Sequence, residues 1–376
     1  MGPVLSTRSH EVRPTSALNA ETDQLHGEAA VSSHRSTIMN NLQKIRHSAA
    51  ARPIDFSGDP RLSPGTRKFL EALNGSGGAP LETLSPEDAR VVLAQTQAAM
   101  HVELLGIEES QHTITAGAFT LELDLVRPAN SHGILPAFMF VHGGGWVLGD
   151  YPTHRRLVRD LVVRTGYAAV FVNYSRTPEV RYPQPVEEVY AATKWVAEHG
   201  GEDLRVDGNR LAIVGSSVGG NMSAVTCILA KERGGPALKQ QILLWPTVDH
   251  DFDTESYRQF GMQRFLTRSL MMWMYDLYTT DPSQRREVRA SPLRATSEQL
   301  RGLPQALIVV AENDILRDEG EAYGRKLEAA GVEVATVRFD GMIHDFGMLN
   351  GLAREPGTLA MLDLMAARLR LVLGAP

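Results

Sequence analysis

The stretch from Leu211 to Gly220 reads LAIVGSSVGG and decides the fold of this chain. Its first half is apolar and as long as one buried strand, and it ends abruptly in Gly-x-Ser-x-Gly. A run of small and apolar residues without a helix breaker follows at 222–230, which predicts a helix. A strand, a sharp turn and a helix in this order are typical of an elbow that presents a reactive serine at its tip. Gly215 and Gly219 provide the space that such a turn needs around Ser217.

Predicted strands and helices alternate on both sides of this elbow. Continuous apolar runs, typical of central parallel strands, occupy 137–141, 168–172, 211–214, 242–244 and 306–310. Helical patterns lie between them, at 154–164, 186–198, 222–233 and 318–330. Alternating segments at 121–126 and 334–339 predict an antiparallel strand and an edge strand. We therefore predict one α/β domain over 109–376, with a mostly parallel eight-stranded sheet and helices on both faces.

Two other segments do not follow this alternation. Residues 51–108 have helical patterns, with Ser63-Pro64 and Ser85-Pro86 as helix starts. Between Pro246 and Pro304 no strand is evident, and 260–278 carries more apolar side chains than one core-facing stripe needs. We expect 51–108 and 250–290 to form a helical cap over the catalytic end of the sheet. The alternative is an extra helix buried at the side of the sheet. The polar, aperiodic residues 1–50 are expected to be a disordered tail.

A serine hydroxyl becomes a nucleophile only beside a base, and the base needs an orienting acid. After Ser217 the chain has two histidines, His250 and His344. His344 follows the last predicted strand, so its loop lies at the same edge of the sheet as the elbow. We therefore predict His344 as the base.

The acid is expected after the preceding strand, because the chain order on this fold is serine, acid, histidine. Asp314 lies where that strand ends, and we predict it as the acid. Glu312 and Asp318 are weaker candidates, and Asp318 is better placed to cap the following helix.

Donors for a developing oxyanion are predicted in His142-Gly-Gly-Gly-Trp146, which follows another buried strand. Three glycines let backbone N–H groups approach a substrate oxygen closely. A phosphate-cradling loop is the alternative, but neither this stretch nor 215–220 has the pattern or the lysine that such a loop requires.

The composition restricts the partners. The formal net charge of -6 argues against nucleic acid or an anionic membrane. No apolar run approaches the ~20 residues of a membrane span, and no secretory signal is visible, so we expect no stable membrane insertion and a cytoplasmic location. The single cysteine, Cys227, fits a reducing compartment. The acidic cluster at 249–253 does not match a calcium loop, and we expect neither a metal nor an organic cofactor.

Four blocks make the chain resemble the hormone-sensitive-lipase-like esterases, bacterial family IV of the α/β-hydrolase superfamily. They are HGGGW at 142–146, GSSVGG at 215–220, DILRDEG at 314–320 and GMIHDF at 341–346. The resemblance covers about 55 to the C-terminus and implies a catalytic triad of Ser217, Asp314 and His344. It further implies an oxyanion hole formed by the backbone N–H groups of Gly144, Gly145 and Val218, an N-terminal cap, short acyl chains and a homodimer.

Two residues of the elbow depart from the family pattern. Ser216 stands where the family usually has Asp, which removes a charge beside Ser217. Val218 stands where Ala is usual, and its bulkier side chain narrows the space next to the serine. The triad residues themselves are present.

From these residues we predict a serine carboxylesterase that acts on a small-molecule ester of a short-chain acid, with water as the second substrate. The reaction proceeds through an acyl-enzyme intermediate. An amide, a lactone or a deacetylation target uses the same triad and stays open as the substrate. A receptor that binds a small molecule without catalysis is the other alternative.

Overall fold

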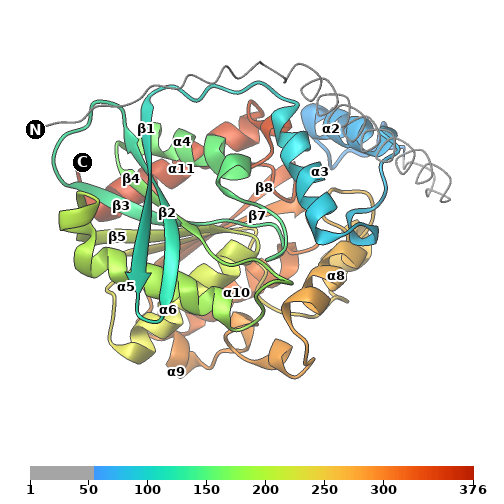
Figure 1. The fold of residues 1–376 in the computed structure, drawn as a ribbon. Coiled ribbons are helices and arrows are strands. Elements are labelled where there is room, and N and C mark those ends of the chain that lie inside the picture. The colour runs from blue at the N-terminus through green and yellow to red at the C-terminus, as the bar shows by residue number, and fades with distance from the viewer. Residues whose placement is uncertain (1–54) are drawn as a thin grey trace, which may run out of the picture. The chain divides into compact units, whose positions relative to one another are not determined.

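The structure is a computed structural model that describes residues 55–376, so the tail predicted at 1–50 and the start of the predicted cap segment, 51–54, lie outside the described residues. One sheet has the strand order β1-β2-β4-β3-β5-β6-β7-β8 (Figure 1). The strands are β1 Ile107–Ala116, β2 Phe119–Pro128, β3 Leu135–Val141, β4 Ala168–Asn173, β5 Val206–Ser216, β6 Gln240–Leu244, β7 Gln305–Asn313 and β8 Val334–Ile343. Strand β2 is antiparallel to β1 and β4, and all other neighbours are parallel. The predicted mostly parallel eight-stranded sheet is confirmed.

Helices cover both faces of the sheet, as predicted. Helices α4 and α11 pack together on one face, and α5, α6 and α10 lie on the other (Figure 1). The α-helices are α2 Pro64–Gly75, α3 Pro86–Ala98, α4 Tyr151–Thr165, α5 Gln184–Asp203, α6 Val218–Arg233, α7 Glu255–Phe260, α8 Arg268–Tyr278, α9 Ser297–Leu300, α10 Arg317–Ala329 and α11 Pro356–Leu373. Within residues 55–376, no helix is both long enough and apolar enough to cross a membrane.

Burial explains the strand patterns. All seven residues of β3 are buried, because helices cover this central strand from both sides. Most of β8 alternates between exposed and half-buried residues, and β8 lies at the edge of the sheet, as the alternation at 334–339 predicted. The carboxyl ends of the parallel strands lie on the same side of the sheet, and the loops that follow the central strands meet there.

The predicted helix starts are partly correct. The hydroxyls of Ser63 and Ser85 accept hydrogen bonds from backbone N–H groups in the first turns of α2 and α3, as expected of N-caps. The prediction for Asp318 is wrong, because α10 begins one residue earlier, with Leu316 at the N-cap. Asp318 Oδ2 instead accepts the N–H of Ser256 in the first turn of α7, at 2.8 Å.

The segment 250–290 packs against the N-terminal helices. The Phe69 and Phe265 rings have centroids 6.4 Å apart. The side-chain amide of Asn74 donates to the carbonyl of Gln263 at 3.0 Å. Helix α8 contacts the 3₁₀ turn η1 (Leu81–Thr83). The apolar excess at 260–278 therefore has two partners, since the buried face of α8 contacts Trp146 in the loop after β3 and the same segment meets the N-terminal region.

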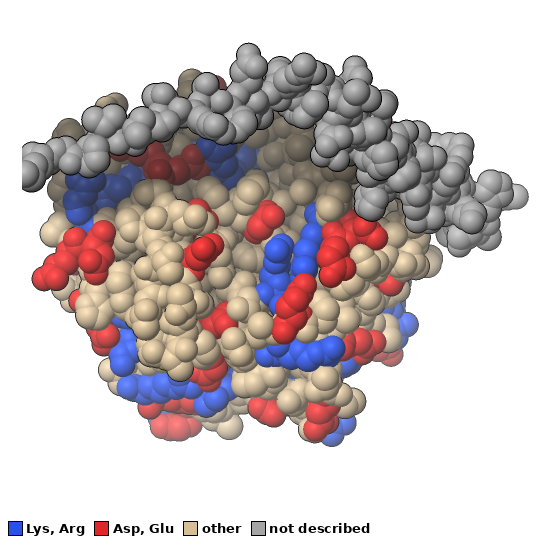
Figure 2. Space-filling model, viewed as in Figure 1, with Lys and Arg blue, Asp and Glu red and all other residues tan. Residues whose placement is uncertain are grey.

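Charged side chains of both signs lie interspersed on the face shown in Figure 2. On the part of this face that the described residues form, neither sign makes up one continuous patch. Such a mixed surface provides no single attractive field for a polyanion.

Candidate active site

Ser217 lies at the turn between β5 and α6. Its backbone angles, φ 55° and ψ −119°, are ones that residues other than glycine rarely adopt. Its N–H donates to the carbonyl of Leu244 at 2.8 Å, which anchors the turn to the end of β6. A Cβ atom on Gly215 would lie 2.2 Å from the carbonyl oxygen of Gly219. A Cβ atom on Gly219 would lie 2.0 Å from the carbonyl oxygen of Val141. Both glycines of the motif are therefore required by backbone contacts.

Gly219→Ala is expected to destabilise the protein by about 1–3 kcal/mol or more, because its methyl group meets rigid backbone of β3. Thermal unfolding should show a lower Tm together with loss of the catalytic activity predicted for Ser217. Gly75→Ala is the matched control, since a Cβ atom there meets nothing within 4 Å. That control should leave the Tm unchanged or slightly raised. An unchanged Tm in Gly219→Ala would contradict the tight turn.

Ser217, His344 and Asp314 come together at the carboxyl edge of the sheet. The Ser217 Oγ–H donates to His344 Nε2 at 3.1 Å. The His344 Nδ1–H donates to Asp314 Oδ2 at 2.7 Å. All three residues are buried. The elbow, the loop after β7 and the loop after β8 each supply one of them, so three separate parts of the chain meet at this edge of the sheet.

The other candidates for the acid and the base, Glu312, Asp318 and His250, do not take part in the hydrogen bonds that join Ser217, His344 and Asp314. Glu312 Oε2 accepts the N–H of Gly341 at 2.8 Å, and Asp318 accepts from Ser256 as described above. His250 Nδ1 lies 3.3 Å from the hydroxyl of Ser291. The other oxygen of Asp314, Oδ1, accepts the N–H of Leu316 at 3.0 Å, so backbone also orients this carboxylate.

Charge and burial act in opposite directions on His344. Burial lowers the pKa of the imidazole, but the carboxylates of Asp314 and Asp345 and the hydrogen bond from Nδ1 outweigh burial and raise the pKa above its ordinary value of 6.5. Sequence reasoning missed Trp245, whose Nε1–H donates to Asp345 Oδ1 at 2.7 Å and whose ring lies edge-on to His344. Trp245 follows β6 directly, and its position after a predicted buried strand was the available signal.

The glycine loop after β3 has the conformation that glycine allows. Gly144 has φ 98° and Gly145 has φ 65°. The N–H of Leu148 donates to the carbonyl of Gly144 at 2.7 Å and closes the loop. Among the described residues, the N–H groups of Gly144 and Gly145 donate to no protein acceptor. These N–H groups are therefore available to a substrate oxygen.

Two neighbouring elements hold this loop in place. The indole of Trp146 stacks on Tyr278 of α8, with ring centroids 4.0 Å apart. The guanidinium of Arg90 on α3 donates from Nε to the carbonyl of Val147 at 2.7 Å. The side chain of Met274 lies so near Gly145 that a Cβ atom there would be 1.9 Å from Sδ. Helices α3 and α8, which belong to separate parts of the sequence, thus contact the same glycine loop.

The two unusual elbow residues are buried. Within the described chain, the hydroxyl of Ser216 is buried without a hydrogen-bond partner. Val218 is the first residue of α6 and is fully buried. Neither side chain interrupts the hydrogen bonds between Ser217, His344 and Asp314.

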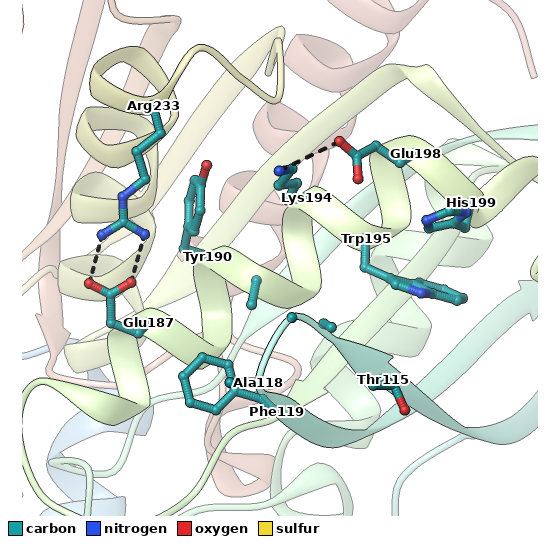
Figure 3. Close-up of a pocket in the computed structure, with 13 residues that line it drawn as sticks. Thr115, Ala118, Phe119, Glu187, Tyr190, Lys194, Trp195, Glu198, His199 and Arg233 are labelled. Atoms are coloured by element: carbon teal, nitrogen blue, oxygen red, sulfur yellow. Dashed lines mark hydrogen bonds and ion pairs between the residues drawn. The ribbon is translucent and has the colours of Figure 1, made fainter.

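Two cavities lie away from the hydrogen-bonded group of Ser217, His344 and Asp314. A cavity of about 340 Å³ lies between α5 and the turn from β1 to β2. The aromatic residues that line it include Phe119, Tyr190 and Trp195 (Figure 3). The charged groups around it pair with one another, as the dashed lines between Arg233 and Glu187 in Figure 3 show. A second cavity of about 420 Å³ lies beside His142, behind the glycine loop. None of the three residues Ser217, His344 and Asp314 lines either cavity.

Comparison with known proteins agrees with this geometry. Residues 138–348, more than half of the chain, match a family described as having the alpha/beta hydrolase fold. A putative alpha/beta hydrolase from Acanthamoeba polyphaga mimivirus is 34% identical over 310 residues, which are 82% of this chain and 88% of that protein. The chain belongs to the α/β-hydrolase family.

Several of the proteins that it is similar to are esterases. The crystal structure of a thermostable esterase from Pseudomonas putida is 55% identical, has a TM-score of 0.83 and matches 85% of this chain and 100% of its own. An ethyl acetate hydrolase from Pseudomonas putida is 30% identical, over 78% of this chain and 94% of the relative. The carboxylic ester hydrolase LipN of Mycobacterium tuberculosis is 38% identical over 65% of each. This protein is accordingly a carboxylic ester hydrolase, and the predicted family is confirmed.

Proposed function

We propose that this protein hydrolyses short-chain acyl esters with Ser217 as nucleophile, His344 as general base and acid, and Asp314 as the orienting carboxylate. The observation that carries this proposal is the pair of hydrogen bonds from Ser217 Oγ to the imidazole of His344 and from that imidazole to Asp314. Ser217 Oγ attacks the ester carbonyl carbon while His344 Nε2 takes the hydroxyl proton. The alcohol then leaves with that proton, and an acyl-enzyme remains. Water, deprotonated by His344, attacks the acyl-enzyme, and Ser217 recovers its proton as the carboxylic acid departs.

The backbone N–H groups of Gly144, Gly145 and Val218 form the oxyanion hole of this proposal. Two observations support this role: the N–H groups of the two glycines donate to no acceptor within residues 55–376, and Val218 lies in the first turn of α6. Three backbone donors stabilise the negative oxygen of both tetrahedral intermediates. This proposal needs no metal and no organic cofactor.

We also propose that 51–108 and 250–290 together act as the cap over this site, while 109–376 forms the catalytic domain. The contacts of Arg90 and of α8 with the glycine loop support this division. Met274 and the rings of α8 occupy space beside the loop, which favours a small acyl group.

The acyl-chain preference tests the substrate proposal. Initial rates on p-nitrophenyl esters of C2 to C12 acids should be highest at C2 to C4 and fall for longer chains, because Met274 restricts the space beside Gly145. Met274→Ala should move the preference toward longer chains. Met272→Ala is the matched control, because Met272 lies on the exposed side of the same helix. A preference for C10 or longer in the unaltered enzyme would refute the proposal.

The pH dependence follows from His344. The base must be neutral to accept the serine proton, so activity is lost as pH falls through the imidazole pKa. Because nearby carboxylates raise this pKa, the acid limb of kcat/KM should lie above about pH 6.5. Asp345→Asn removes one of these charges and should move the limb to lower pH, whereas Asp340→Asn, on the exposed part of β8, should not. A limb below about pH 6 in the unaltered enzyme would contradict the assignment.

A cytoplasmic location and a homodimer complete the proposal. The single cysteine supports a reducing compartment. The position of β8 at the edge of the sheet and the family resemblance support association of two copies. Sedimentation equilibrium would give the mass of the assembly directly.

A further inference from the structure

Asn313 lies at the junction between the two strands that carry the acid and the base. It is the last residue of β7, directly before Asp314, and is fully buried. It pairs with Ile343 at the end of β8, directly before His344. Its side-chain amide donates from Nδ2 to the carbonyls of Met342 and Arg61, at 3.3 and 2.6 Å. One amide group thus ties the end of β7 to the end of β8.

Arg264 decides which way this amide faces. Its Nη1 donates to Asn313 Oδ1 at 2.7 Å. A guanidinium offers only donors, so it must meet the oxygen of the amide and not the nitrogen. The NH₂ group is thereby turned toward the two carbonyls. Without Arg264, the amide can rotate and present its oxygen to them.

The loop between α7 and α8 places Arg264 for this contact. Arg264 is 6% exposed, although Met262 in the same loop is 71% exposed. A second nitrogen of the guanidinium, Nη2, forms an ion pair with the carboxylate of Asp59 in the N-terminal segment. Its guanidinium also lies 5.1 Å from the ring centroid of Phe260.

Both neighbours of Arg264 have left-handed backbone conformations. Gln263 has φ 55° and Phe265 has φ 73°. Such conformations carry a cost in non-glycine residues and persist where surrounding contacts determine them. The inward direction of the Arg264 side chain is therefore enforced by its contacts on three sides: Asn313, Asp59 and the aromatic ring.

We propose that Asn313 is a positioning residue for the Asp314–His344 pair and that Arg264 sets its orientation. This inference rests on the proposed catalytic roles of that pair. The amide holds the two strand ends in register, so the carboxylate and the imidazole meet at hydrogen-bonding distance. A displacement of about 1 Å between catalytic groups costs on the order of 10²-fold in rate.

The test uses substitutions that conserve charge, so that a change in the field at His344 does not confuse the result. Asn313→Ala removes the bridging amide, and Arg264→Lys keeps the charge but not the fork geometry. The matched controls are Asn209→Ala and Arg258→Lys. Both residues are exposed, and neither has a role in the proposed mechanism. The readouts are kcat, KM and the pH profile on p-nitrophenyl butyrate, each per folded protein measured by circular dichroism.

We expect Asn313→Ala to lower kcat by about 10- to 100-fold with KM within about threefold. Its acid limb should move to lower pH, because a displaced Asp314 no longer raises the pKa of His344, while Asp345 still faces the ring. Arg264→Lys should show the same changes at smaller size. The two controls should stay within about twofold of the unaltered enzyme.

A kcat within about threefold and an unshifted acid limb in folded Asn313→Ala would overturn the inference. If Asn313→Ala does not fold, Asn313→Ser decides by the same two criteria, because a serine hydroxyl has one donor and cannot bond to both carbonyls. The failure of the proposed function is a different result: in that case Ser217→Ala stays active, whatever Asn313→Ala does.

Discussion

Ser217→Ala is expected to lower kcat on p-nitrophenyl acetate by about 10⁴–10⁶-fold. The hydroxyl that donates to His344 Nε2 is the only group of the protein that forms a bond to the acyl carbon in the proposed mechanism. Alanine fits the same backbone and leaves the turn in place, so the loss is chemical and not structural. Binding of the ester should change little, because the proposed oxyanion donors are backbone groups.

Steady-state kinetics and thermal unfolding together check this expectation. The Tm of Ser217→Ala should remain close to that of the unaltered enzyme. Ser223→Ala is the matched control, since its hydroxyl on α6 is buried without a hydrogen-bond partner in the described chain. Near-normal hydrolysis by Ser217→Ala would sink the nucleophile assignment.

Asp314→Asn should lower kcat by roughly 10³–10⁴-fold. The carboxylate accepts the Nδ1–H of His344 at 2.7 Å, which leaves Nε2 unprotonated toward the serine. An amide can offer its NH₂ to Nδ1 instead, and this favours the tautomer that cannot accept the serine proton. The loss of a negative charge also removes one cause of the raised pKa of His344, so the acid limb should move to lower pH.

Two further substitutions decide whether the acid is correctly assigned. Asp318→Asn and Glu312→Gln change carboxylates in α10 and β7, on either side of the loop that holds Asp314, and both carboxylates make other hydrogen bonds. Each should reduce kcat by less than about tenfold, and the acid limb should stay in place. A larger loss in either variant than in Asp314→Asn would move the acid to that residue.

Several features of this site were predictable because each depends on a short stretch of sequence. The elbow requires glycines on both sides of Ser217, since Cβ atoms there would meet backbone at 2.0–2.2 Å. The expectation that Ser217, Asp314 and His344 lie close together follows from parallel strands that end at one edge of the sheet. Their meeting at hydrogen-bonding distance agrees with that argument.

Other features depend on contacts between distant residues that carry no local pattern. Arg264 and Asn313 are 49 positions apart, and nothing in either stretch indicates that a guanidinium meets an amide. The stacking of Trp146 on Tyr278 joins the glycine loop to α8 and is likewise invisible in the sequence. The prediction for Asp318 failed for the same reason, because its carboxylate serves the start of α7 and not its own helix.

The sequence by itself determined the alternating α/β architecture, the glycine-flanked Ser217 and the places of Asp314 and His344 after their strands. Local sterics and the periodicity of burial determine these features, and both are written in consecutive residues. Only the tertiary structure decided how the strand ends are held together, through Asn313, Arg264 and Asp59. A buried guanidinium and amide need partners, and packing alone decides which distant groups come within reach.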